Sequence, residues 1–239
     1  MKLSLRFFQF FQRKKAVPFA GVLLLLVLLA WGAGRFYSRG GGPAPEEMLE
    51  QGLQKTSAST SFRYGAEVRY TGAGGAGADL YGRVEGERVA PDRVRMRGTI
   101  MNNPVEFVQV GDTSYIKDQE SGRWISLPGN KLVDSELFYA ELNPLAFFAF
   151  KDVPGIRYRG VEQVNGERFH ALELRPSVSD PFLEMLLTDY TCKVWLSRDD
   201  HRLRQAVIRA KEKRGSGGTF EITLRFWDYD KNITINPPL

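Results

Sequence analysis

Apolar and polar side chains alternate over most of the chain. In residues 62–70 the apolar side of this alternation consists of Phe62, Tyr64, Ala66, Val68 and Tyr70. A period of two is typical of a β-strand with one buried face. The same alternation returns in residues 80–85, 93–100 and 219–227, and residues 105–110 make another strand. These segments therefore predict antiparallel strands that each bury one side.

Turn sequences separate the strand-like segments. Asn165-Gly166 has the composition of a two-residue hairpin turn, and Gly111-Asp112 is a second tight turn. Short connections of this kind predict a meander of about ten or eleven strands, of which the last covers residues 233–235. The expected fold class is α+β, mostly β: a curved antiparallel half-barrel covered by short apolar helices.

Two segments interrupt the strands with apolar helical patterns. Residues 132–150 predict two short helices that are separated at Asn143-Pro144, and residues 180–188 predict another helix that begins at Pro181. A helix that is apolar on all sides must be buried or face an apolar partner. Two interpretations stay open: the helices are plain core, or they cover a cavity that accepts acyl chains.

Residues 16–34 form an uncharged apolar run. As a helix they extend about 28 Å, close to the roughly 30 Å of a bilayer core. Five basic residues precede the run and only Arg35 and Arg39 follow it closely, which predicts a cytoplasmic N-terminus and an extracytoplasmic remainder. We expect an uncleaved signal-anchor in the cell membrane; a cleaved signal with a site at 32–34 is the alternative.

The apolar run also sets the domain boundaries and explains the charge. We expect a cytoplasmic basic segment at 1–15, the anchor at 16–34, a linker at 35–44 and one domain at 45–239. Residues 1–39 hold seven of the 33 Lys and Arg side chains and none of the 28 Asp and Glu side chains. The remainder therefore carries 26 basic against 28 acidic residues, which argues against a nucleic-acid partner.

No catalytic or metal-binding pattern emerges from the sequence. Residues 72–77 match GxGxxG, but they lie between two predicted strands and not before a helix, so they predict a hairpin loop. His170 and His201 lack metal-ligand spacing, and Cys192 stands alone in a strand pattern. The sequence predicts no enzyme, no metal and no cofactor. A cleft that joined His170, Cys192 and an acidic side chain would revive an enzymatic interpretation.

Residues 45–239 resemble the LolA/LppX-LprG-like lipoprotein carriers, with the RseB/MucB-type regulators as relatives. The resemblance begins with a helix that precedes a long alternating strand. It also rests on loose patterns at 112–117 with Trp124, 160–166, 194–197, 226–230 and 233–238. It implies an open antiparallel half-barrel whose apolar hollow binds lipid or lipoprotein acyl chains. It further implies that this hollow is lined by Leu145, Phe147, Phe148, Phe150, Phe182, Leu183 and Leu186.

The chain departs from these carriers at its start. LolA is a soluble shuttle and the LppX-LprG group is anchored through a lipidated cysteine, whereas Cys192 is the only cysteine here. The resemblance thus implies a membrane-tethered binding protein whose partner is a lipid or an acylated protein, acting in local lipid or lipoprotein transfer. The alternative is a protein-binding envelope sensor of the RseB type that carries no lipid and binds an envelope membrane protein.

Overall fold

A computed structural model describes residues 43–74, 77, 79–134, 142–178, 181–213 and 217–238. The predicted basic segment, the apolar run at 16–34 and most of the linker lie outside the described residues. Within the described part of the chain, no helix has both the length and the apolar character needed to cross a membrane. Residues Ala44–Leu239 form a unit of their own.

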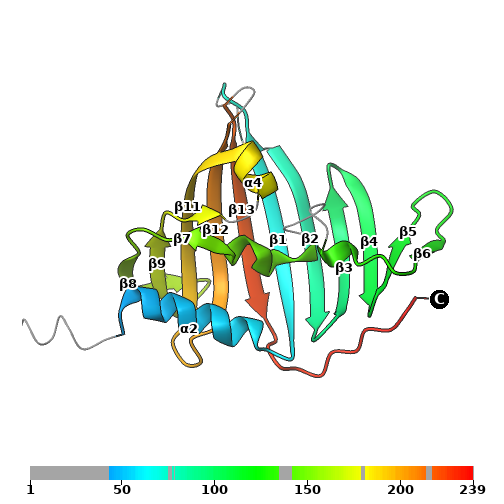
Figure 1. Cartoon of the computed structure of the whole chain (residues 1–239), viewed down its shortest axis with the longest axis horizontal. Coiled ribbons are helices and arrows are strands. Elements are labelled where there is room, and N and C mark those ends of the chain that lie inside the picture. The colour runs from blue at the N-terminus through cyan, green and yellow to red at the C-terminus, as the bar shows by residue number, and fades with distance from the viewer. Residues whose placement is uncertain are drawn as a thin grey trace, which may run out of the picture. The chain divides into compact units, whose positions relative to one another are not determined.

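Eleven of the described strands form one antiparallel sheet that is open and curved (Figure 1). Its edges are β6 and β8, and every other strand pairs with one strand on each side. From one edge to the other, the strands are β6 (Trp124–Leu127), β5 (Thr113–Lys117), β4 (Asn103–Val110), β3 (Arg93–Ile100), β2 (Asp79–Val89), β1 (Ser61–Thr71), β13 (Thr219–Trp227), β12 (Leu203–Glu212), β11 (Leu187–Ser197), β9 (Glu167–Leu174) and β8 (Arg157–Val164).

The predicted alternation is confirmed in β1, β3 and β13. On β1, Phe62, Tyr64, Ala66 and Val68 are buried, whereas the intervening Arg63 and Glu67 are only partly buried. The period-two pleat places the first set on what we call the inner face and the second set on the outer face. The hairpin at Asn165-Gly166 is also confirmed, since both residues adopt positive φ (51° and 89°) between β8 and β9.

The two ends of the domain meet in the middle of the sheet. β1 and β13 pair over nine positions, from Arg63 opposite Trp227 to Thr71 opposite Thr219. This pairing joins the strands β1–β6 to the strands β8, β9 and β11–β13. The glycine-rich loop after Thr71 connects the antiparallel pair β1 and β2, as the sequence predicted.

The few helices all lie on the inner face (Figure 1). Helix α2 (Pro45–Ser57) crosses one end of the strands, and α4 (Pro181–Leu186) lies at the other end. Between them runs a segment that we call the strap, residues 131–152, of which 135–141 lie outside the described residues. The strap contains the 3-10 helices η1 (Leu132–Asp134) and η2 (Pro144–Phe148) and the strand β7 (Phe150–Asp152), which pairs with β10 (Ser177–Val178).

The strap is fixed to the sheet by buried polar groups. Gln109 of β4 accepts a hydrogen bond from the Val133 N–H at 3.2 Å. The Ser114 hydroxyl of β5 donates to the Asn130 carbonyl at 2.6 Å and accepts from the Leu132 N–H at 3.2 Å. Gln109 and Ser114 are both buried, and they supply acceptors for the Val133 and Leu132 N–H groups of the strap.

Three predicted elements differ from the structure. Residues 233–235 form no strand, because β13 already pairs on both sides and offers no free edge. Instead, Ile233 and Ile235 pack with Val108, and Arg93 donates to the Ile235 carbonyl at 2.9 Å. The helix predicted to end at 188 ends at Leu186. Residue 150 begins a strand, not a helical turn.

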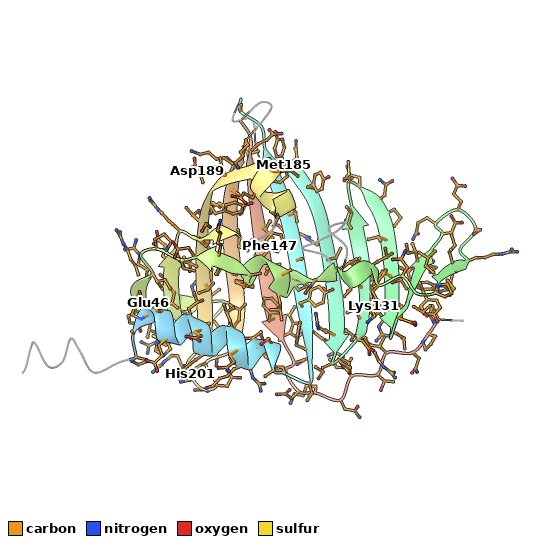
Figure 2. All side chains as sticks on the ribbon, in the orientation of Figure 1. Glu46, Lys131, Phe147, Met185, Asp189 and His201 are labelled. Carbon is orange, nitrogen blue, oxygen red and sulfur yellow. The ribbon has the colours of Figure 1, made fainter. Side chains whose placement is uncertain are left out.

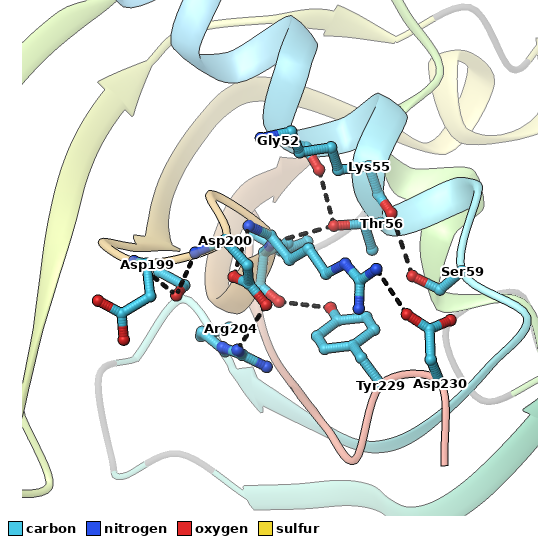
Figure 3. Close-up of polar contacts among 12 residues, drawn as sticks. Gly52, Lys55, Thr56, Ser59, Asp199, Asp200, Arg204, Tyr229 and Asp230 are labelled. Carbon is cyan, nitrogen blue, oxygen red and sulfur yellow. Dashed lines mark hydrogen bonds and ion pairs between the residues drawn. The ribbon is translucent and has the colours of Figure 1, made fainter. Parts of the chain in front are cut away.

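The C-terminal end of α2 is locked to the sheet by Thr56 (Figure 3). The buried Thr56 hydroxyl donates to the Gly52 carbonyl at 2.7 Å and accepts from the Leu203 N–H at 2.9 Å. The Tyr229 hydroxyl donates to the Leu203 carbonyl. Gly52 permits the close approach, since a Cβ there would lie 2.8 Å from Leu196 Cδ2.

We expect Thr56→Val to lower the free energy of unfolding by about 2 kcal/mol. Valine keeps the shape of the side chain but leaves the buried Leu203 N–H without its acceptor. Urea denaturation followed by tryptophan fluorescence measures the loss. The neighbouring Ser57→Ala serves as control, because the Ser57 hydroxyl is exposed and donates only within the helix. Equal stability of Thr56→Val and the parent protein would contradict this role.

Candidate functional site

An apolar pocket of about 320 Å³ lies between α4, the strap and the inner face of the sheet. Figure 2 shows two of its lining residues, Phe147 at the middle of the strap and Met185 on α4. The full lining consists of Phe147, Leu183, Met185, Leu186, Leu187, Glu212, Phe220 and Ile222. Separate segments of the chain therefore come together to form the pocket.

Helix α4 covers the pocket, and hydrogen bonds from Tyr190 and Lys213 hold it. The Tyr190 hydroxyl donates to the Leu183 carbonyl at 3.1 Å, and the Lys213 N–H donates to the Leu186 carbonyl at 2.9 Å. The Lys213 ammonium donates to the Glu184 carbonyl. Because β11 begins directly after Leu186, α4 cannot move far without disturbing the sheet.

The floor of the pocket comes from β13. Phe220 and Ile222 alternate onto the inner face, as the sequence predicted for residues 219–227. The Phe220 ring contacts two neighbouring aromatic rings, with centroid distances of 4.8 Å to Tyr70 and 6.3 Å to Tyr81. These contacts fix the Phe220 ring, so the floor is a packed aromatic surface.

The mouth of the pocket is apolar and open to solvent. Met185 and Leu186 are 53% and 42% exposed, whereas Leu183 behind them is 8% exposed. Exposed apolar side chains are ordinary when they occur singly. Here two of them continue into an apolar pocket, so a nonpolar ligand could enter without crossing a polar barrier.

Six of the seven predicted site residues have described side chains, and these six lie in two environments. Phe147, Leu183 and Leu186 line the pocket. Phe148 is buried in the main core, and the partly buried Leu145 and Phe150 pack against that core. The side chain of Phe182 lies outside the described part of the chain.

Sequence reasoning did not select Met185, Leu187, Glu212, Phe220 and Ile222 as site residues. Their strands or helix were predicted, and the inward alternation of Phe220 and Ile222 was a usable signal. Glu212 carried no such signal, because a polar residue at the end of a strand is ordinarily solvated.

The structure does not bring Cys192 and His170 together at one position of the sheet. Burial raises the pKa of the Cys192 thiol to about 12, so it is a poor nucleophile at neutral pH. Cys192 pairs with Leu174 on the sheet, whereas His170 pairs with Leu196, four residues further along β11. Among the described residues, no three His, Cys, Asp or Glu side chains are grouped as metal ligands.

The two histidines are stacked on each other at the α2 end of the sheet. Their ring centroids lie 6.1 Å apart with an interplanar angle of 15°, and the Tyr158 hydroxyl is 2.9 Å from His170 Nδ1. The pKa of His170 is lowered, first because burial opposes its protonation and then because of repulsion by His201 and Arg198. The folded state therefore favours neutral His170.

We expect the free energy of unfolding to fall as the pH drops below about 6.5, the ordinary pKa of histidine. Below that pH the unfolded chain takes up a proton at His170 more readily than the folded chain does. Urea midpoints at pH 7.5 and 5.5 measure this loss. His170→Gln is expected to reduce the difference between the two pH values; an unchanged difference would show that His170 does not contribute.

The outer face carries rows of charged side chains around Trp227. Glu87 accepts hydrogen bonds from both Arg63 and Arg95. Partial burial opposes the ionisation of Glu87, but these two hydrogen bonds outweigh it and hold the pKa of Glu87 below its ordinary value. Such pairs are partly solvated, so they contribute little stability individually.

Three hollows of about 480, 650 and 760 Å³ on the outer face share Trp227 as a lining residue. The Trp227 ring lies over Gly65, where a Cβ would be 3.6 Å from its Cζ3 and Cη2 atoms. The register places Gly65 between Arg225 and Glu85, and Glu85 beside Arg97. Arg97 and Arg225 are exposed and form no ion pair with another described residue.

Solved structures similar to this chain include two mycobacterial proteins. The lipoprotein LppX of Mycobacterium tuberculosis aligns with a TM-score of 0.52 and 21% identity over 82% of this chain and 100% of its own. LprF of Mycobacterium bovis aligns with a TM-score of 0.51 and 15% identity over 83% and 99%. A LolA superfamily protein of Nitrosomonas europaea, NE2245, aligns more loosely, with a TM-score of 0.37 and 12% identity over 81% and 96%.

These likenesses concern the fold. No protein-family model and no curated protein matches the sequence. At identities of 21% and below, a shared fold does not transfer a ligand or a site from one protein to another. What this domain binds must therefore be argued from its own pocket and surfaces.

Proposed function

Because the chain has the LolA/LppX-LprG-like fold, we propose that it is an extracytoplasmic, envelope-associated binding protein and not an enzyme. It holds an acyl chain of a lipid or lipoprotein in the pocket beneath α4. The observation that carries this proposal is the pocket itself: seven of its eight lining side chains are apolar. A volume of about 320 Å³ lies at the lower end of the roughly 300–1,000 Å³ typical of ligand pockets.

The pocket suits part of one acyl chain better than several chains. Most of the inner face is filled by the main core cluster, which includes Phe147 and Phe148 of the strap. Each methylene removed from water contributes about 0.8 kcal/mol, so six buried methylenes contribute about 5 kcal/mol before the costs of association. This is enough for reversible capture, which a carrier or transfer protein requires.

The sequence adds a tether to this proposal. We propose that residues 16–34 anchor the chain in the cell membrane, with residues 1–15 in the cytoplasm and the domain 45–239 outside. A tethered domain would act in local lipid or lipoprotein transfer. Protease added to intact spheroplasts is expected to degrade the domain; full protection, with degradation only after lysis, would contradict this topology.

Native mass spectrometry of the full-length protein in a mild detergent tests lipid binding. We expect a bound acyl lipid, and we expect Ile222→Phe to remove most of it, because Ile222 lines the pocket and a larger side chain grows into it. Thr223→Phe is the matched control, since the adjacent residue faces the outer side of the same strand. A parent protein without bound or exchangeable lipid would overturn the proposal.

A second candidate function is protein binding through the outer face. Trp and Arg are enriched at the centres of interfaces, and Trp227 lies among hollows lined by Arg63, Arg97 and Arg225. An envelope membrane protein with an acidic segment would fit this surface.

Charge reversal distinguishes this function from lipid binding. The double change Arg97→Glu and Arg225→Glu is expected to abolish crosslinking to such a partner in membranes while the lipid content stays unchanged. The double change Arg157→Glu and Arg175→Glu, on two exposed residues outside these hollows, controls for the same change in net charge. Unchanged crosslinking in the double variant would remove the outer face from consideration.

A further inference from the structure

One ionisable side chain lines the apolar pocket, namely Glu212 at the end of β12. The inward positions of this strand are Ala206, Ile208 and Ala210, which are all buried, and Glu212 follows at the same spacing. The carboxylate thus continues an apolar row and reaches the pocket from the side of the sheet. Its neighbour across the ladder is Leu187, another lining residue.

Glu212 has a hydroxyl partner but no cation among the described residues. Its Oε2 atom accepts a hydrogen bond from the Tyr70 hydroxyl at 3.3 Å. The two lysines beside it in sequence have other partners: Lys211 pairs with Asp189 at 3.1 Å, and the Lys213 ammonium donates to the Glu184 carbonyl. The negative charge of the Glu212 carboxylate is therefore not neutralised by a neighbouring side chain of the described part.

An uncompensated carboxylate selects among the polar ends of lipids. An ionised carboxylate only accepts hydrogen bonds, so it favours a group that donates them. A carboxylate or phosphate placed beside it is repelled, and this repulsion is stronger in a partly desolvated pocket than in water. Apart from the Tyr70 hydroxyl, the side chains that line the pocket around Glu212 are apolar and offer it no donor.

We propose that the pocket selects acyl lipids whose polar end is an uncharged hydroxyl-bearing group, which donates a hydrogen bond to Glu212, over lipids with an anionic end. This inference rests on the proposed function, because it assigns the polar end of the same acyl ligand. Glu212 is thus the specificity-determining residue of the pocket, and Tyr70 orients its carboxylate. The seven apolar lining residues hold the chain without distinguishing the two kinds of lipid.

Two probes with the same acyl chain test this selection. Delipidated full-length protein is titrated with 1-monolauroylglycerol and with laurate at neutral pH, each below its micelle concentration, and binding is measured by calorimetry. We expect 1-monolauroylglycerol to bind about tenfold more tightly than laurate. This comparison needs no variant, so it does not depend on the folding of a mutant.

Two glutamine variants then assign the effect to one residue. Glu212→Gln keeps the shape and removes the charge, and it is expected to tighten laurate binding until the two affinities differ by less than about threefold. Glu184→Gln removes an exposed carboxylate on α4 outside the pocket lining, and it is expected to leave the tenfold ratio unchanged.

The outcomes separate this inference from the proposed function. Equal affinities for the two probes in the parent protein, or tighter binding of laurate, would overturn the inference and leave acyl binding intact. If the ratio of the two affinities changed equally in Glu212→Gln and Glu184→Gln, the selection would come from net charge and not from the pocket. That result would overturn the role of Glu212. Binding of neither probe would overturn the proposed function and the inference with it.

Discussion

Replacing Leu224 with alanine is expected to lower the free energy of unfolding by about 4 kcal/mol. Leu224 lies on β13 in the centre of the sheet and is 0% exposed. Its cross-strand neighbours are Ala66 on one side and Ala206 on the other. A single leucine therefore fills the space that two small residues leave.

The surroundings of Leu224 explain why we expect a value in the upper part of the usual range. The cost of a Leu→Ala change increases with the volume of the cavity that remains. In the Leu224→Ala variant, the substituted residue would lie between Ala66 of β1 and Ala206 of β12. These three small side chains could not close the cavity by small shifts. The cavity would also lie at the pairing that joins the two ends of the domain, so it weakens the centre of the sheet.

Urea denaturation of the parent protein and the variant measures this difference. Leu186→Ala is the matched control, because the same substitution is made at a side chain that is 42% exposed. We expect it to cost less than about 1 kcal/mol. If Leu224→Ala lost no more stability than Leu186→Ala, the residues around position 224 would have repacked to fill the cavity.

The second large effect is expected at Gly98, where alanine should cost about 3 kcal/mol. Gly98 lies on β3 opposite Val84 of β2. A Cβ at Gly98 would lie 2.1 Å from the Arg83 carbonyl oxygen and 2.6 Å from the Val84 Cα atom. Both atoms belong to the backbone of the paired strand, so the collision can be relieved only by moving β2 away from β3.

Gly74→Ala provides the comparison for Gly98→Ala. A Cβ at Gly74 would meet nothing within 4 Å, and we expect that change to stay within about 0.5 kcal/mol of the parent protein. Thermal unfolding of the two variants measures the contrast. Similar melting temperatures for both would mean that β2 and β3 separate more easily than their register suggests.

Both stability predictions concern the sheet that carries the pocket, and the first bears on the pocket directly. The floor of the pocket is formed by β13, the strand on which Leu224 lies. A loosened centre of the sheet would move Ile222 and Phe220 relative to α4. We therefore expect a destabilised Leu224→Ala protein to bind acyl lipid more weakly even though Leu224 does not line the pocket.

Most strand faces were predictable from the sequence because the signal is local. The residues from Phe62 to Val68 alternate, and the pleat of a strand turns that alternation directly into an inner and an outer face. The Asn165-Gly166 hairpin and the break before Pro144 were predictable for a similar reason. Each depends on the dihedral preferences of one or two residues.

The pairing of segments was less predictable. Residues 233–235 have a strand-like pattern, yet whether they form a strand depends on a free edge, and β13 has β1 and β12 on its two sides. The sequence likewise predicted Leu187 near the end of an apolar helix, because its strand partner could not be identified from the sequence. Leu187 pairs with Glu212, a residue far away in the chain, and becomes the first residue of β11.

The sequence by itself determined that this is a mostly-β domain with a few apolar helices, and it placed Phe147, Leu183 and Leu186 on those helices. Only the tertiary structure decided which of these side chains line a pocket and which fill the core. It also brought Glu212 and Tyr70 together beneath α4. The physical reason is that the burial pattern of a strand or helix depends on residues that are close in sequence. A pocket, in contrast, is the space left between residues that are distant in sequence.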